Sequence, residues 1–119
     1  MTLTEGIIKS GLDRKIPCCM SPENSILNVE ARVASQAMAS LNRSGDPYWT
    51  SRYRRLTKTI KRHRFAVMAA VGSTYSDIWD SIMAHEYFSD VASVRHKMLG
   101  IGAEAMNGKM FVCIITGDK

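Results

Sequence analysis

The sequence predicts an α+β fold in which about three helices pack on a small antiparallel sheet with a C-terminal β-hairpin. One observation is the spacing of apolar side chains over 26–41 and 75–83, which follows the three- and four-residue repeat of helices with one buried side. The other is the C-terminal pair of stretches, 99–105 and 110–116, which flank Asn107-Gly108, a pair typical of a tight turn between strands. A chain of 119 residues suits one domain that buries its own core.

The N-terminal segment has no clear periodic pattern. Gly6, Gly11 and Pro17 interrupt residues 1–20, so we expect an irregular N-terminal arm that packs on a single α+β domain spanning residues 21–119.

The first helix is expected to start at Ser21 and Pro22, because serine suits the N-cap position and proline the first helical position. Gly45 supplies a natural stop. The apolar positions that predict its core-facing side are Ile26, Val29, Val33, Ala37 and Leu41, widened by Leu27, Ala34 and Met38.

The most unusual stretch is SRYRRLTKTIKRHR, residues 51–64, with seven Lys or Arg residues and no acid. The chain carries a net charge of +5, so the other residues sum to 5 − 7 = −2. On a helix, Tyr53, Leu56, Ile60 and Val67 fall on one side, which predicts a helix that docks on the core and runs into the buried segment FAVMAAVG. The candidate residues for binding a partner or nucleic acid are Arg52, Arg54, Arg55, Lys58, Lys61, Arg62 and Arg64.

Three interpretations of this cationic segment remain open. It is a solvated helix face, a docking surface for an acidic protein partner, or a nucleic-acid interface that displaces counterions from phosphates. A membrane surface fits less well, since the apolar side offers no exposed cluster of Trp or Phe.

A third helix is expected from Thr74, with Asp77 completing a variant of the capping box. Its core-facing side is expected to hold Tyr75, Ile78, Trp79, Ile82 and Met83. Residues 85–97 are expected to form a loop with one short helical turn.

The cysteines and apolar runs indicate the compartment. Cys18, Cys19 and Cys113 form an odd set with two adjacent members, which favours reduced thiols. No apolar run approaches the ~18 residues of a membrane span, and the N-terminal stretch, with Glu5, does not resemble a secretory signal. We therefore expect a cytoplasmic or virion location without a membrane.

The order of motifs resembles a known family. LNVEARVASQAMASLN is followed by the basic segment, AAVG, TYSDIWDSIMAHEYF and LGIGAEAMNGKMFVCIITGD. Over about residues 25–118, this order is similar to the CAP superfamily, the cysteine-rich secretory and pathogenesis-related proteins, in its short bacterial and phage versions. The resemblance implies helices around a small sheet and a pocket of two His and two acidic residues that can hold a metal.

The chain departs from the pocket that the resemblance implies. SGDPYW stands where the first His is expected, MAAVG stands where the Glu is expected, and His85 lies near the second His without a partner in sequence. We therefore expect no metal, no cofactor and no enzymatic activity.

The function expected from these observations is that of a non-enzymatic structural or protein-interaction module in a larger assembly, such as a phage virion component or a host-directed phage protein. Its partner would be another protein or a second copy. The first alternative is a nucleic-acid-binding module that uses the basic segment 51–64. The second is a CAP-like hydrolase or lipid binder centred on His85.

Overall fold

The computed structural model describes residues 2–15, 24–61, 64–85 and 98–118. These ranges form four helices and one three-stranded antiparallel sheet, in which the last strand of the chain lies between the other two. The α+β class is therefore confirmed, with one helix more than expected. The elements in chain order are α1 (Leu3–Lys15), α2 (Ser25–Leu41), α3 (Trp49–Thr59), β1 (Arg64–Gly72), α4 (Tyr75–Met83), β2 (Met98–Met106) and β3 (Lys109–Asp118).

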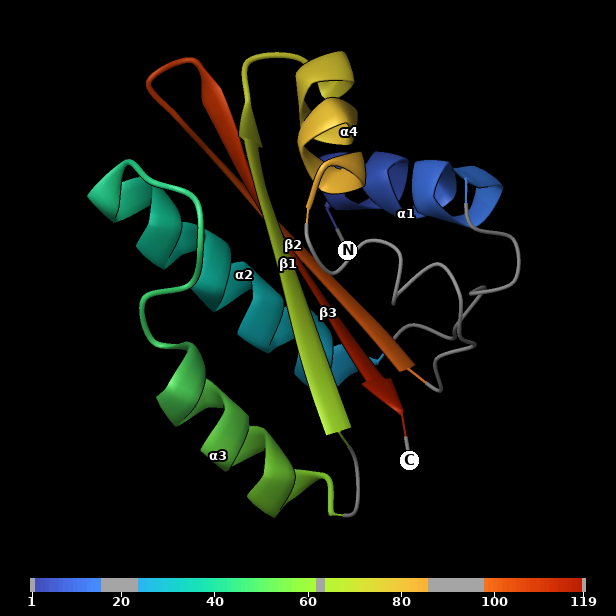
Figure 1. Ribbon diagram of the computed structural model, residues 1–119, viewed down its shortest axis with the longest axis vertical. Coiled ribbons are helices and arrows are strands. Elements are labelled where there is room, and N and C mark those ends of the chain that lie inside the picture. Colours follow the sequence, from blue (N-terminus) through green and yellow to red (C-terminus); the bar gives the residue numbers. More distant parts are fainter. Residues whose placement is uncertain (1, 16–23, 62–63, 86–97, 119) are drawn as a thin grey trace.

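Helices cover both faces of the sheet (Figure 1). On one face, Ile8 of α1 and Ile78 of α4 pack on side chains such as Ile114 of β3. On the other face, Met38 of α2 and Leu56 of α3 pack with their own set of strand residues. Successive side chains of a strand point to opposite faces, so each strand supplies both clusters.

The C-terminal hairpin is confirmed. β2 and β3 pair along their whole length and meet at the Met106–Lys109 pair. Asn107 (φ 53°) and Gly108 (φ 75°) both adopt the left-handed conformation that the tight turn needs.

The expected helix over the basic segment is too long. α3 ends at Thr59, and Arg64 opens strand β1, so FAVMAAVG pairs with β3 instead of continuing the helix. The hydroxyl of Thr59 donates to the carbonyl of Arg55, a local bond that weakens a helix end. Since helices cover both sheet faces, β1 is apolar at nearly every position and lacks the alternation that marks a strand.

The irregular arm expected over residues 1–20 is wrong at 3–15, which form α1. Thr2 and Glu5 form a capping box: the Thr2 hydroxyl accepts from the Glu5 N–H, and Glu5 Oε1 accepts from the Thr2 N–H. A Cβ at Gly11 would overlap the Trp79 ring, so this glycine lets α1 lie against α4. α1 also buries Ile8 and Leu12 in the core, so this part of the predicted arm belongs to the folded domain.

Both ends of α2 differ from the expected ones. The helix begins at Ser25, and the side chain of Asn24, not Ser21, accepts from the Leu27 N–H at 3.1 Å. It ends at Leu41 because Asn42 turns left-handed (φ 51°), three residues before Gly45. Ser21 and Pro22 lie outside the described residues.

The cap of α4 is confirmed, since the Thr74 hydroxyl accepts from the Asp77 N–H at 3.1 Å. Its core-facing side is narrower than expected: Ile78 and Ile82 are buried, whereas Tyr75 and Met83 are exposed. The loop expected over 85–97 falls, apart from His85, outside the described residues.

α2 lies directly on edge strand β2. A Cβ at Gly100 would overlap the Leu27 backbone, and one at Gly102 would overlap the Ala31 backbone, so the two glycines permit this contact. Three backbone groups of β2 also form hydrogen bonds with helix residues. The partners are Glu5 of α1, Asn28 of α2 and the α2 cap residue Asn24, and covering an edge strand in this way is a common protection of a sheet edge. These bonds join Asn24 N–H to Leu99 O (2.8 Å), Ile101 N–H to Asn28 Oδ1 (3.0 Å) and Ala103 N–H to Glu5 Oε2 (3.2 Å).

Candidate interaction site

Arg52, the first of the seven predicted binding residues, is a structural residue. It is only 2% exposed because it shares the inner side of α3 with Leu56, four residues on. Its guanidinium donates to Asp46 Oδ2 at 2.6 Å and to Glu30 Oε2 at 2.9 Å. The guanidinium of Arg52 is therefore neutralised inside the protein, and this residue adds no exposed charge to the predicted binding segment.

Arg55 belongs to the same ion-pair cluster. It donates to both carboxylate oxygens of Glu30, at 3.1 and 2.7 Å, so Glu30 of α2 holds two arginines of α3. Burial acts to raise the pKa of Glu30, but the hydrogen bonds from Arg55 and Arg52 outweigh it and hold that pKa below its ordinary value. Burial acts to lower the pKa of Arg52, and hydrogen bonds to Asp46 and Glu30 outweigh it and raise that pKa. The cluster fastens α3 to α2.

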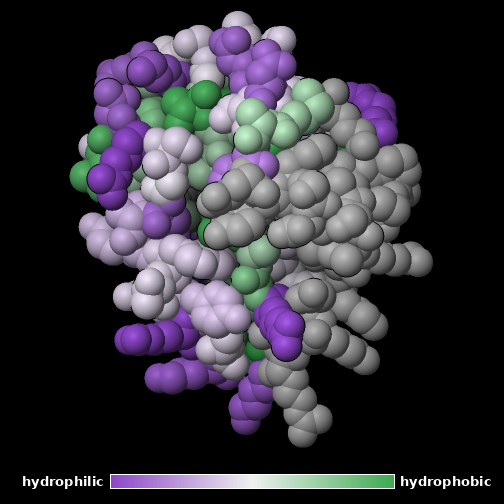
Figure 2. All heavy atoms as spheres, in the orientation of Figure 1, coloured by the Kyte–Doolittle hydropathy of each residue, from purple (hydrophilic) through white to green (hydrophobic). Residues whose placement is uncertain are grey.

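The remaining described cations are exposed. Arg54 and Lys58 lie on the outer side of α3, Lys61 follows the helix, and Arg64 opens β1. Arg62 lies outside the described residues. Figure 2 shows hydrophilic side chains projecting from the region of α3, at the lower left. This cationic flank (Arg54, Lys58, Lys61 and Arg64) is smaller than the sequence predicts.

The outer side of α2 exposes several apolar residues beside Ser25, Gln36 and Ser40. The positions predicted to face the core include Ile26, Val29, Val33 and Leu41, yet all four are between 40% and 57% exposed. The three residues that widen the predicted core-facing side, Leu27, Ala34 and Met38, are buried as the sequence predicts. We call the exposed set, with the half-buried Ala37, the α2 outer stripe.

The burial of α2 follows from the close contact with β2. The two strand glycines draw the side of α2 that carries Leu27 and Ala31 onto the sheet, and the opposite side is left to solvent. An apolar stripe that a helix leaves exposed to solvent marks a candidate contact surface. The stripe is therefore the strongest candidate site among the described residues.

The borders of the stripe carry compensated charge. Glu30, on one side, is paired with Arg52 and Arg55. Arg32, on the other side, donates through Nη2 to Glu5 Oε1 at 2.7 Å. These are the two charged residues of α2, and each is paired within the protein. The stripe thus suits an apolar, uncharged partner surface.

Glu5 is fully buried and ties three elements together. Its carboxylate accepts from Arg32 of α2, from Ala103 of β2 and from the Thr2 N–H. Burial acts to raise the pKa of Glu5, but the hydrogen bond from Arg32, followed by those from Thr2 and Ala103, outweighs it and keeps the pKa below its ordinary value of 4.5. The role of Glu5 is structural.

The pKa of Glu5 predicts an acid-sensitive fold. Below about pH 4.5, the unfolded chain binds a proton at Glu5 that the folded protein still excludes, so stability falls as the pH drops through the folded pKa. Above about pH 4.5, the carboxylate of Glu5 contributes its full stabilisation to the folded protein. Urea unfolding at several pH values should show this acid limb, and Glu5→Gln should make it shallower. An acid limb of equal slope in both proteins would show that Glu5 does not contribute.

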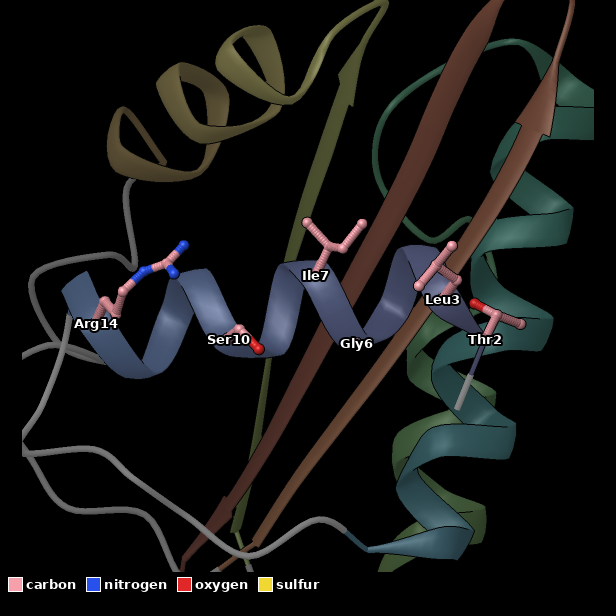
Figure 3. A pocket seen from close by; sticks show the side chains of 6 residues that line it. All are labelled: Thr2, Leu3, Gly6, Ile7, Ser10 and Arg14. Carbon is pink, nitrogen blue, oxygen red and sulfur yellow. The ribbon is translucent and has the colours of Figure 1, made fainter.

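The groove on α1 offers little chemistry. Its volume is about 540 Å³, and Figure 3 shows side chains spread along the helix without converging on one point. It has hydroxyls and one guanidinium but no carboxylate among the described lining residues: Thr2, Leu3, Gly6, Ile7, Ser10 and Arg14.

The described residues also hold no group of three His, Cys, Asp or Glu side chains that could bind a metal. Cys113 is buried, and burial raises the pKa of its thiol, which makes it unreactive. His85 lies just past α4. The acidic residues that follow it in sequence, Glu86 and Asp90, fall outside the described ranges. No helix within the described part of the chain is long and apolar enough to cross a bilayer.

Comparison with known proteins gave no match, either to a protein-family model or to a curated protein. The chemistry of the site therefore rests on the geometry described above.

Two features of the site were missed by the sequence interpretation, although each left a signal. Arg52 lies four residues before Leu56 and so on the same side of the helix, which points to a buried charge that needs a carboxylate. α2 holds more apolar positions than one buried side can use, which points to a second contact surface.

Proposed function

We propose that this chain is a non-enzymatic protein-interaction module of a larger assembly, and that it contacts its partner through the α2 outer stripe. The observation that carries the proposal is the exposure of Ile26, Val29, Val33 and Leu41 along one side of a well-packed helix. Leaving these side chains in water gives up the stabilisation that burial supplies, at about 25 cal/mol per Å². A partner surface that covers them recovers it.

A CAP-like assignment remains part of this proposal. What supports it is the order of elements: a helix, the basic segment, a strand, a second helix and a hairpin with the sequence LGIGAEAMNG. A phage virion component or a host-directed phage protein would suit such a chain. A hydrolase or lipid binder centred on His85 is the weaker alternative, since the described residues hold no group of three His, Cys, Asp or Glu side chains that could bind a metal.

A nucleic-acid role for the basic segment is likewise weaker than the protein-interaction role. Arg52 and Arg55 are held by Asp46 and Glu30, so fewer cations remain to displace counterions from phosphates.

Site-specific photo-cross-linking in cells tests the proposal. A photoreactive amino acid at Val33, in the centre of the stripe, should give cross-links to protein. The matched control is Met83, which is 43% exposed against 46% for Val33 but lies on α4, across the sheet. Cross-links that are no more abundant from position 33 than from position 83 would contradict the proposal.

A further inference from the structure

We infer that the occupant of the α2 outer stripe is a second copy of this chain, whose α2 packs antiparallel to the first about Val33. This inference rests on the proposed function and names its partner. In a two-fold symmetric pair, the same patch faces itself, so the patch must be complementary to its own reversed copy. The stripe meets this requirement in both size and charge.

The size pattern is self-complementary. If Val33 of one copy meets Val33 of the other, residues whose numbers sum to 66 lie level with each other. Apart from Val33, which meets its own copy, the large residues of the stripe then lie level with small residues of the same helix, as interdigitating helices require. The level pairs are Val29 with Ala37, Ile26 with Ser40 and Leu41 with Ser25.

The charge pattern favours the antiparallel arrangement. α3 lies beside the part of α2 that contains Glu30, because Glu30 binds Arg52 and Arg55. Glu30 belongs to the N-terminal half of α2, and antiparallel packing carries the two N-terminal halves to opposite ends of the pair. The cationic flanks of the two copies are then separated. The borders of the stripe add no uncompensated charge, since Glu30 and Arg32 are both paired.

The small area of the stripe predicts a dimer that dissociates reversibly. From Ile26 to Leu41 the helix rises about 22 Å, at 1.5 Å per residue, so a single helix face is smaller than a standard stable interface of about 800 Å² per partner. The molar mass in solution should therefore rise with concentration from 13.3 kDa towards twice that value.

Cysteine cross-linking tests the register. In a background of Cys18→Ser and Cys19→Ser, which leaves the buried Cys113, Val33→Cys should form a disulfide-linked dimer on mild oxidation because the two thiols meet at the symmetry axis. Val29→Cys is the matched control. Its copies lie eight residues apart along the paired helices, about 12 Å, and should remain reduced. Equal cross-linking at both positions would indicate parallel packing and overturn the antiparallel arrangement.

Sedimentation equilibrium tests the occupant. Val33→Glu should raise the dimer dissociation constant at least tenfold by placing two carboxylates together, whereas Met83→Glu, on α4, should leave it unchanged. A wild-type chain that stays monomeric up to about 500 μM, a concentration at which a dimer with a Kd of ~100 μM would be mostly assembled, would overturn the second copy as partner. If the chain is monomeric but position 33 cross-links to a different protein in cells, the proposed function stands and only the second copy is excluded. If position 33 gives no cross-links either, both the proposed function and the dimer are contradicted.

Discussion

Replacing Arg52 with alanine is expected to lower the free energy of unfolding by about 3–5 kcal/mol, the range for removing one member of a buried ion pair. The side chain of Asp46 is completely buried, and its carboxylate would lose the guanidinium at 2.6 Å. Glu30 would lose one of its two arginines. Urea unfolding followed by circular dichroism measures the change.

Arg54→Ala is the matched control for this prediction. Arg54 lies on the same helix, but its side chain points to solvent, so its removal should leave the unfolding midpoint within experimental error. If the two variants lost similar stability, the buried ion pair would not account for the effect of Arg52→Ala, since alanine is itself a better helix former than arginine.

The second large effect is expected from Gly102→Ala. A methyl group at this position would overlap the backbone of Ala31 and the Arg32 amide, and a backbone cannot rotate away as a flexible side chain can. α2 would have to move off β2, which would strain the hydrogen bond between Asn28 and Ile101. We expect a loss of about 3 kcal/mol or more, at the upper end of overpacking costs.

Gly6→Ala is the control for the glycine prediction. Gly6 lies within α1, and a Cβ there would meet no atom within 4 Å. Alanine is the better helix former by about 1 kcal/mol, so this variant should be slightly more stable than the wild type. Thermal unfolding of the two variants side by side would separate the effects, and a Gly102→Ala protein with wild-type stability would contradict the close packing of α2 on β2.

Local sequence patterns are sufficient to predict those features whose interactions lie within a few neighbouring residues. The turn at Asn107-Gly108 needs two left-handed residues in sequence, and the chain supplies a pair that tolerates them. The Thr74 cap of α4 likewise depends on bonds within three residues. The Thr2–Glu5 box at the start of α1 is of the same kind, but Gly6 and Gly11 behind it obscure the helix in the sequence pattern.

Packing decided the features that local patterns could not. Gly11 weakens a helix in isolation, yet the Trp79 ring fills the space that it leaves. The apolar run from Phe65 fits a buried helix as well as a strand covered on both faces, and pairing with β3 decides between them.

The α+β class and the C-terminal hairpin follow from the amino-acid pattern alone, because apolar spacing and turn residues act over short distances along the chain. Long-range packing sets which side of α2 is covered and which cations stay exposed to solvent. Gly100 and Gly102, far from α2 in sequence, select the side that meets the sheet and leave Val29 and Val33 in solvent. Glu30, far from α3 in sequence, takes up Arg52 and Arg55, since a buried charge requires a partner wherever the fold brings one.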